Sequence, residues 1–498
     1  MAFDPLSGQF DFNDWDKQQV LQAMCTFMPS QNVLHLPSQL GPYECDGLSA
    51  YRKVPKMVVL PETIEQCQQV VRYCQQHSIP LIARGAGTGL AGGVLPVEQA
   101  IVLSLAKFNQ ITRIDPLQRI AIVQPGVRNL AISEAAAQYG LYYAPDPSSQ
   151  IACSIGGNVA ENSGGVHSLK YGLTVNNVLG LKIINSDGEL LDIGGGECMD
   201  SPGYDLLALM HGSEGLLGII VEVTLRLIPK PPSAQVILAA FNEIVDAGKA
   251  VRDIISGGII PAGLEMMDKL AIQAAEDFVH AGYPLAQALL LCELDGTQSD
   301  IDQQMEKVKQ ILNDCNAHDI RLSKDDQQRA LFWAGRKAAF PAVGRISPDY
   351  YCMDGTIPRQ ALPEVLGQIS QFSEHYGLAV ANVFHAGDGN LHPLILYDAN
   401  KPGDLQKAEN FGGDILRLCV DMGGTITGEH GVGVEKLDQM CHQFQTAELR
   451  QFHQIKAQLD HTGILNPGKA IPSLHRCAEL GAMHVHNGQL PHPEIPRF

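Results

Sequence analysis

Two histidines stand on either side of a short glycine turn in the segment HAGDGNLH. Asp388-Gly389 lies at its centre, and a hairpin centred there places His385 directly opposite His392, with Cβ atoms about 4.5–5.5 Å apart. Both imidazoles then point to one face, with a spacing suited to one divalent metal ion. A carboxylate is the expected third ligand, and Glu429 in the segment GEHGVG supplies one between glycines. The alternative is that the two histidines only form hydrogen bonds in a turn.

Glycine is concentrated in two loops of the N-terminal half. The first glycine loop, residues 83–93, reads ARGAGTGLAGG, and the second glycine loop, residues 144–165, reads APDPSSQIACSIGGNVAENSGG. Such clusters indicate unusual backbone dihedrals or a close approach to a ligand, and they argue against a packed helix. Backbone amides of glycine turns form anion cradles. The two loops therefore predict one extended cofactor with a pyrophosphate; the alternative is two surface loops without a ligand.

The first glycine loop contains RGAGTG, which is similar to the dinucleotide fingerprint of a Rossmann fold. In that fold the loop must open a helix whose N-terminus holds the pyrophosphate. Here GGVLP follows from Gly92, and the next element expected is a strand at residues 100–105. This context excludes a Rossmann NAD site and leaves phosphate binding by a loop.

The elements that must position these residues predict an α+β chain in four parts. Residues 1–50 form an N-terminal helical segment, and a βαβ unit with later strands fills residues 51–232. Prolines at 229, 231 and 232 mark the next boundary. In residues 233–425 strands alternate with longer helices, which predicts two β-α-β arrays on one antiparallel sheet. Residues 426–498 return to loop and helix.

The composition excludes several classes of protein. The 498-residue chain has a formal net charge of −19, which disfavours nucleic acid or anionic lipid as a direct partner. The acidic start does not resemble a secretory signal, and no run of 18 apolar residues predicts a membrane span. Twelve cysteines occur without any C-x-x-C spacing, so no iron–sulfur cluster is expected in this chain. We expect a cytoplasmic protein that reaches a membrane only through a partner.

Together these segments resemble the FAD-linked oxidoreductases of the vanillyl-alcohol-oxidase or PCMH-type flavin fold. Within that superfamily the chain is similar to the D-lactate, D-2-hydroxyglutarate and glycolate dehydrogenase group. The resemblance rests on both glycine loops and on HAGDGNLH, GEHGVG, LNPGK, FWAGRKAAFPAVGRISPDYYCMDGTIPR and LHRCAELGAMHVH. It implies a two-part PCMH-type FAD-binding domain, a ferredoxin-like α/β cap domain for the substrate, and a C-terminal segment that returns to the flavin.

The same resemblance assigns roles to individual residues. His385, His392 and Glu429 would bind the metal ion, which would be zinc, manganese or iron. His430 would be the catalytic base and Arg336 the clamp for the substrate carboxylate. The residues expected to hold FAD are Arg84, Gly85, Ala86, Gly87, Thr88 and Gly89 at the pyrophosphate, and Pro147, Ser148, Gly156, Gly157, Asn158, Asn162, Gly165, Glu214, Gly218, Ile220 and Asn466 along the flavin.

Three departures from the group narrow the expectation. Cys352 stands where members that oxidise dicarboxylates have an extra basic residue, and Pro393-Leu394 replaces a polar substrate contact. Both changes favour a small monocarboxylate. The first glycine loop has no histidine to tether FAD, so the flavin should be non-covalent. Cys153 could be a tether, but a buried thiol is the favoured reading.

The implied reaction oxidises glycolate to glyoxylate, and also D-lactate to pyruvate. The metal would lower the pKa of the substrate hydroxyl, His430 would take the proton with a pKa held near the working pH by the adjacent cation, and hydride would pass to the flavin. Electrons would leave through a second flavin subunit and an iron–sulfur subunit of a glycolate oxidase complex, or through a quinone. The alternatives are a self-sufficient D-lactate dehydrogenase, a metal-free flavin reductase and a non-enzymatic scaffold subunit.

Overall fold

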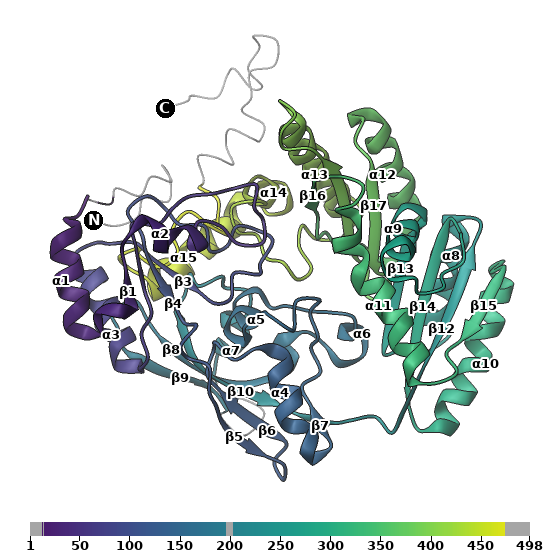
Figure 1. Cartoon of the computed structure of the whole chain (residues 1–498), viewed down its shortest axis with the longest axis horizontal. Helices are drawn as coiled ribbons and strands as arrows, with labels where there is room; N and C mark the ends of the chain where they lie inside the picture. Colours follow the sequence, from purple (N-terminus) through teal and green to yellow (C-terminus); the bar gives the residue numbers. More distant parts are fainter. Residues whose placement is uncertain (1–11, 13, 196–202, 474–498) are drawn as a thin grey trace.

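The computed structural model describes residues 12, 14–195 and 203–473. The segment LHRCAELGAMHVH, one of those that carry the resemblance, begins at residue 474 and lies outside the described residues, as does most of residues 1–13. The described chain forms two sheet-containing parts that lie side by side, with the C-terminal helices packed beside the N-terminal elements (Figure 1).

The N-terminal part contains two sheets. The first has the order β1-β2-β4-β3, with parallel pairing of β2, β4 and β3, and the second is antiparallel with the order β5-β6-β10-β8-β9. Their bounds are β1 (Val33–Leu34), β2 (Met57–Val59), β3 (Leu81–Arg84), β4 (Ile101–Ser104), β5 (Ile111–Asp115), β6 (Ile120–Val123), β8 (Val178–Ile184), β9 (Leu190–Gly194) and β10 (Ile219–Arg226). A short pair, β7 (Leu141–Tyr142) and β11 (Ile228–Pro229), lies beside them.

The local elements of this part follow the predicted patterns. The helix α3 (Ile64–Gln76) begins after Thr63, whose side chain accepts a hydrogen bond from the amide of Gln66, and it buries a stripe at a 3.6-residue period. The hairpin of β8 and β9 turns at Gly188, where φ is +73°. The other helices are α1 (Lys17–Phe27), α2 (Pro37–Leu40), α4 (Asn129–Ala136), α5 (Ile155–Glu161), α6 (Ser168–Tyr171) and α7 (Leu206–Met210).

The second glycine loop differs from the prediction, because part of it is helical. Gly156 and Gly157 lie in α5, and Gly156 is packed so closely that an added Cβ would lie 2.5 Å from Cβ of Pro125. Glycine here permits close packing of a helix rather than an unusual dihedral. The first glycine loop contains no helix before β4 begins at Ile101, so the argument against a Rossmann fold is confirmed.

The C-terminal part is built on one antiparallel sheet, which we call the cap sheet, with the order β15-β12-β14-β13-β17-β18-β16. Its strands are β12 (Ser233–Phe241), β13 (Gly263–Asp268), β14 (Ala288–Gly296), β15 (Asp319–Leu322), β16 (Asp349–Cys352), β17 (Val380–His385) and β18 (Asn390–Tyr397). Its helices are α8 (Ile244–Ser256), α9 (Lys269–Val279), α10 (Gln298–Asp314), α11 (Asp326–Val343), α12 (Leu362–Tyr376) and α13 (Asp404–Asp421). The predicted alternation of strands and helices is confirmed, although β13, α9, β16 and α13 were not predicted.

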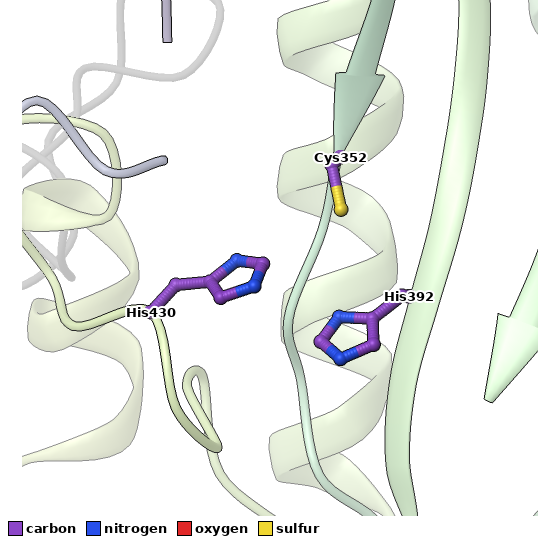
Figure 2. A group of neighbouring side chains, drawn as sticks. All are labelled: Cys352, His392 and His430. Carbon is purple, nitrogen blue, oxygen red and sulfur yellow. The ribbon is translucent and has the colours of Figure 1, made fainter. Parts of the chain in front are cut away.

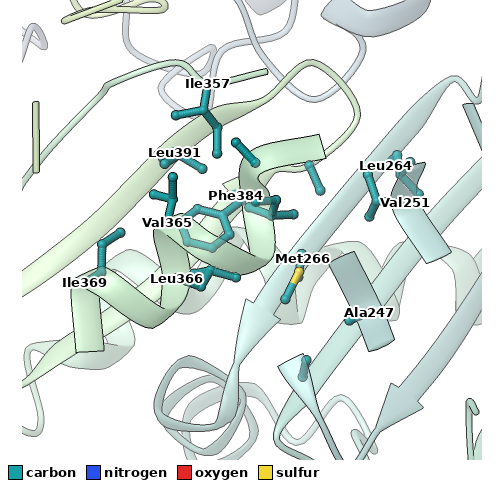
Figure 3. Close-up of a cluster of buried hydrophobic side chains, with 14 of the residues drawn as sticks. Ala247, Val251, Leu264, Met266, Ile357, Val365, Leu366, Ile369, Phe384 and Leu391 are labelled. Carbon is teal, nitrogen blue, oxygen red and sulfur yellow. The ribbon is translucent and has the colours of Figure 1, made fainter. Parts of the chain in front are cut away.

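The cap sheet separates two apolar clusters. Alternate strand residues such as Leu264, Met266 and Phe384 pack with Val251 of α8 and Val365 of α12 (Figure 3). Their neighbours in sequence face α9 and α11 on the other side of the sheet. Toward the N-terminal part, this second face changes from apolar to polar side chains, and the candidate site lies there.

The chain then returns to the N-terminal part through α14 (Leu437–Gln443) and α15 (Thr446–Leu459). Leu465 forms a parallel bridge with Leu81 of β3, and Ile464 and Leu465 are buried in the core of the first sheet. The predicted return of the C-terminal segment is therefore confirmed. Among the described residues, no helix has the length and apolar character needed to cross a membrane.

Candidate active site

The two histidines of HAGDGNLH come together as predicted, but in a different register. His385 pairs with Asn390 across β17 and β18, and His392 pairs with Val383. The reason is a four-residue turn, closed by a 3.0 Å hydrogen bond from the amide of Gly389 to the carbonyl of His385. Val383 and His385 lie two residues apart on one strand, so both histidines still share a face. Their ring centroids are 5.0 Å apart.

Glu429 completes a compact group with these histidines. Its Oε1 lies 3.0 Å from Nε2 of His392 and 3.4 Å from Nε2 of His385. One donor atom from each of the three residues falls within 4.8 Å of the others, and the group is largely buried. Two imidazole nitrogens and one carboxylate form a donor set suited to a divalent ion with open coordination positions. These residues therefore fit the metal that the sequence predicts.

Asp354 shapes the loop that carries Glu429. It is fully buried and accepts hydrogen bonds from the successive amides of Gly428, Glu429 and His430 at 2.8–3.3 Å. Lys436 is also fully buried and lies 3.1 Å from the same carboxylate. Burial opposes ionisation of Asp354, but Lys436 and the nearby histidines outweigh it and hold the pKa of this carboxyl well below its usual value. The loop is thus wrapped around one buried ion pair.

Replacing Asp354 with Asn should destabilise the protein and loosen the loop that carries Glu429, the predicted metal ligand. The change leaves the Lys436 ammonium buried without its anion, which typically costs about 3–5 kcal/mol. We expect Asp354→Asn to lower the thermal unfolding midpoint and the metal content together, measured by calorimetry and elemental analysis. Asp421→Asn, at an exposed aspartate that pairs with His442, is the control. Wild-type stability and metal content in Asp354→Asn would contradict this account of the loop.

A second group of possible ligands overlaps the first. Cys352, His392 and His430 also place donor atoms within 4.8 Å of one another, and Figure 2 shows His430 approaching His392 from the opposite loop. The Cys352 thiol points to the carbonyl of Met353 at 3.4 Å, and burial raises its pKa well above the usual value. A protonated thiol is a poor metal ligand, so the group with Glu429 is favoured.

His430 is stacked on His392 with ring centroids 4.9 Å apart, and its Nε2 lies 3.9 Å from Oε1 of Glu429. The sequence predicts that Glu429 and His430 point to opposite sides of an extended segment. Instead both side chains turn toward His392, because their backbone curls around Asp354. Nδ1 of His430 is buried without a hydrogen-bond partner among the described residues. Burial lowers the pKa of His430 to about 4, below the expected range near neutrality, so its ring is neutral and can accept a proton.

Arg336 is buried beneath His385 and is not exposed to solvent. It is 2% exposed, and its Nη2 forms an ion pair at 2.6 Å with Oε2 of Glu265 on β13. The other oxygen of Glu265 lies 2.8 Å from Nδ1 of His385. Glu265 therefore fixes the ring of a predicted metal ligand, as carboxylates behind metal-bound histidines commonly do. Nε of Arg336 has no hydrogen-bond acceptor among the described residues, so this donor remains for an anion.

A cavity of about 440 Å³ joins the two glycine loops to this site. His392, Glu429 and His430 line one end, and both glycine loops line the rest. A smaller cavity of about 70 Å³ continues from Gly85 and Gly157 toward β10. The chain thus has an elongated space that ends at His392, Glu429 and His430.

Comparisons with known proteins agree with this arrangement. The model of an FAD binding domain matches residues 55–194, and that of the FAD linked oxidases, C-terminal domain, matches residues 230–470. The glycolate oxidase subunit GlcD of Escherichia coli (strain K12) is 60% identical over 97% of both chains. The chain belongs to the FAD-linked oxidase family. A D-lactate dehydrogenase of Archaeoglobus fulgidus is 31% identical, over 84% of this chain and 92% of that relative.

Solved structures show the same fold at low sequence identity. p-Cresol methylhydroxylase with substrate bound has a TM-score of 0.78 and is 18% identical, covering 93% of this chain and 98% of that one. Alkyldihydroxyacetonephosphate synthase has a TM-score of 0.72 at 17% identity, covering 94% and 88%. The predicted PCMH-type flavin fold is therefore confirmed. The two matching family models show that the cofactor is FAD.

The first glycine loop of this FAD-linked oxidase fits the pyrophosphate. Gly85, Ala86, Gly87, Thr88 and Gly89 line the larger cavity, and the amides of Gly87, Thr88 and Gly89 donate no hydrogen bond to the described residues. Free amides in a glycine turn are what an anion requires. Arg84 lines the smaller cavity, and its Nη1 donates to the carbonyl of Cys45 at 2.9 Å.

The other predicted FAD residues fall into two groups. Those that line the two cavities are Pro147, Ser148, Gly156, Gly157, Asn158, Glu214, Gly218 and Ile220. Asn162, Gly165 and Asn466 line neither. Asn162 accepts a hydrogen bond from the amide of Val175, and Asn466 donates to the carbonyls of Gly93 and Glu214. These three residues shape the loops around the cavity.

Several residues at the site were missed by sequence reasoning. Lys337, Phe340 and Pro341 of α11 line the cavity beside His392. Glu161 lines it as well, and its Oε2 is buried without a partner among the described residues. The helical pattern around Arg336 could have indicated that residues 337, 340 and 341 share a neighbouring face. Glu265 and Asp354 had no such local signal.

We expect the FAD to be non-covalent. Cys153 lines the cavity, but burial raises the pKa of its thiol, and a protonated thiol is a weak nucleophile. Acid precipitation of the holoprotein should leave the yellow colour in the supernatant, measured by its absorbance. Denaturation without acid, followed by filtration, is the control. Colour that remains in the pellet would show a covalent flavin.

Proposed function

We propose that this protein oxidises small 2-hydroxy acids, glycolate to glyoxylate first and D-lactate to pyruvate second. The single observation that carries the proposal is the buried group His385, His392 and Glu429, with His430 beside it, at the end of the cavity lined by the glycine loops. The relatives support the substrate class, since one is named a glycolate oxidase subunit and others D-lactate dehydrogenases.

Different residues of the protein accept the substrate proton and orient the group that accepts it. When bound, a divalent ion would supply Lewis acidity at the substrate hydroxyl and FAD would supply the hydride acceptor. His430 accepts the hydroxyl proton at Nδ1, the ring nitrogen that has no partner among the described residues. Asp354 orients this ring through the backbone amide of His430. Burial of the site excludes water and strengthens these electrostatic effects.

The clamp for the substrate carboxylate is assigned to Arg336. Its Nε has no acceptor among the described residues, and an arginine fork matches a carboxylate in a bidentate manner. Arg336 does not line the cavity, whereas the next residue, Lys337, does. Steady-state kinetics can show whether Arg336 or Lys337 binds the substrate carboxylate. Arg336→Lys should raise the KM for glycolate strongly if the fork binds the carboxylate, and Lys337→Met should do so if the point charge binds it.

The walls of the site favour a small substrate with one carboxylate. Phe340 packs edge-on against His392 with ring centroids 6.2 Å apart, and Pro341 adjoins it. Cys352 adds a neutral thiol near His392 and His430, where a cation would be needed for a second carboxylate. A dicarboxylate would therefore place a charge against apolar and neutral groups, which is costly.

The test is anaerobic bleaching of the bound flavin by a panel of hydroxy acids. Glycolate and D-lactate should bleach the visible absorbance, whereas D-2-hydroxyglutarate should do so far more slowly. Bleaching by D-2-hydroxyglutarate at the rate of glycolate would contradict the monocarboxylate proposal. Failure of every 2-hydroxy acid would contradict the proposed reaction itself.

A second candidate is a self-sufficient D-lactate dehydrogenase, which the D-lactate dehydrogenase relatives favour. It would reduce a quinone without another subunit. The isolated chain, supplied with D-lactate and either a soluble dye or a short-chain quinone, distinguishes the two proposals. Turnover with the dye alone supports a subunit, and turnover with both acceptors supports the self-sufficient enzyme.

We propose that the electrons pass to partners in a complex, a second flavin subunit and an iron–sulfur subunit, which hold this protein at a membrane. The support is that the relative of 60% identity is itself named a subunit. Membranes from cells that lack the partners should not respire on glycolate when this chain alone is added, as measured with an oxygen electrode. Addition of the complete complex is the control. Respiration restored by this chain alone would contradict the complex.

A further inference from the structure

The short segment 166–171 joins the two parts of the molecule next to the site. It follows the second glycine loop directly. Its side chains lie in close contact with the cap sheet. A Cβ added to Gly387 in the histidine turn would lie 2.5 Å from Cδ2 of Leu169, and one added to Gly263 on β13 would lie 2.8 Å from Cγ1 of Val166. The segment therefore contacts both the turn that carries His385 and the strand that carries Glu265.

His167 forms the polar centre of this contact. Its amide and Nδ1 lie 3.1 and 2.9 Å from the carboxylate of Asp146, which adjoins the cavity residues Pro147 and Ser148. Its Nε2 lies 3.3 Å from Oε1 of Glu293 on β14. One imidazole thus bridges a carboxylate of the second glycine loop and a carboxylate of the cap sheet. Burial opposes its charge, but Asp146 and Glu293 together raise the pKa of His167 to about 10.

The bridge continues to the helix that carries the predicted clamp. Oε2 of Glu293 accepts a hydrogen bond from Nε1 of Trp333 at 2.5 Å and lies 3.5 Å from Nη1 of Arg329. Both residues are on α11, where Trp333 lies one turn and Arg329 two turns before Arg336. Arg336 in turn pairs with Glu265, which holds the ring of His385.

These contacts connect the second glycine loop to the group of His385, His392 and Glu429 through polar pairs on both sides of helix α11, which supplies the link between Trp333 and Arg336. The members of this connection are Asp146, His167, Glu293, Trp333 and Arg329 of α11, Arg336, Glu265 and His385. A parallel contact supports it, because Lys170 and Tyr171 both bind Asp295, two residues beyond Glu293 on the same face of β14. His167 is the member that crosses between the two parts.

We propose that His167 is a positioning residue that sets the distance between the flavin and the substrate held by the cap sheet. The proposal rests on the proposed function, since it concerns the hydride step. His167 touches neither the reacting atoms nor the metal group. Its effect comes through the place of α11 and β13, and a misplacement of about 1 Å can slow a reaction about 10²-fold.

The experiment compares His167→Gln with His167→Arg in the holoprotein. Glutamine keeps a polar side chain but removes the positive charge, whereas arginine keeps the charge and can contact two carboxylates. We expect His167→Gln to retain FAD and metal and to slow flavin reduction at saturating glycolate by about 10–10²-fold, with a smaller change in KM. His167→Arg should recover most of the rate. His442→Gln, which removes a histidine from an exposed pair with Asp421, should leave the rate unchanged.

Hydrogen exchange gives a readout that does not depend on turnover. The amide of Gly387 donates to the carbonyl of Leu264 at 3.0 Å, next to Leu169. This amide should exchange faster in His167→Gln than in the wild type, and His167→Arg should restore its protection. If His167→Gln fails to fold, Glu293→Gln breaks the same bridge from the other side.

The outcomes separate the two proposals. A wild-type protein whose flavin no 2-hydroxy acid bleaches would overturn the proposed function, while the exchange of Gly387 would still decide the role of His167. Wild-type flavin reduction and wild-type exchange in His167→Gln would overturn the positioning role. An equal loss in His167→Gln and His167→Arg would also overturn it, since the bridge would not depend on charge.

Discussion

His430→Asn is expected to slow reduction of the flavin by glycolate by about 10²–10⁴-fold, the usual loss when a general base is removed. Asparagine has a similar reach but cannot take up a proton near neutral pH. The ring of His430 is buried and neutral, its Nδ1 has no partner among the described residues, and it lies in the cavity beside Glu429. The measurement is anaerobic stopped-flow bleaching at saturating glycolate.

FAD and metal content should survive this change, because His430 is held in place through its backbone amide by Asp354. His442→Asn, at an exposed histidine, is the matched control. If His430→Asn reduced its flavin at the wild-type rate, Glu429 or a metal-bound hydroxide would become the candidate base. If it lost its metal instead, the group of Cys352, His392 and His430 would be the better ligand set.

His392→Ala is expected to abolish metal binding, because it removes one of the three proposed ligands, whose Nε2 lies 3.0 Å from the Glu429 carboxylate. The wild type should contain about one equivalent of divalent metal per chain, as one such site predicts. Lewis-acid stabilisation of several kcal/mol would be lost, so flavin reduction should slow by about 10²–10³-fold. Elemental analysis of the purified protein measures the first effect and stopped-flow the second.

Two further variants distinguish the group with Glu429 from the overlapping group with Cys352. Glu429→Gln should lose the metal as His392→Ala does, whereas Cys352→Ala should retain it, since the thiol is protonated and points to the carbonyl of Met353. Full metal content in His392→Ala would place the site elsewhere. Metal lost from Cys352→Ala and kept in Glu429→Gln would favour the overlapping group instead.

The residue types at the site could be read from local sequence, but their exact geometry could not. HAGDGNLH predicts a hairpin with two histidines on one face, and that arrangement is present. The register differs because the turn has four residues, among them Gly387, which packs closely against Leu169 of a distant segment. The second glycine loop was misread in part, since Gly156 serves close packing against Pro125 within α5.

Sequence patterns could not predict the side chains that hold the site from distant parts of the chain. Asp354 holds the Glu429 loop from 75 residues away, and Glu265 holds His385 from a distance of 120 residues. Neither carboxylate belongs to a motif. A weaker signal did exist in β14, where Glu293 and Asp295 continue the alternation of Leu289 and Leu291 on one face of the sheet. Polar residues at apolar positions of a strand indicate that the face leaves the core there.

The contacts of Asn466 have a consequence for how the protein is made. Its side chain donates to the carbonyl of Gly93, 373 residues earlier, and the adjacent Leu465 adds to the first sheet beside Leu81. At about 5–20 residues per second, a ribosome needs roughly 20–75 s to travel between the two. During that interval the nascent N-terminal sheet lacks its last partner, and loop closure over such a span is slow. The contact that fixes Gly93, next to the first glycine loop, therefore forms only after residue 466 has been synthesised, and until then the edge of the sheet is open to chaperones.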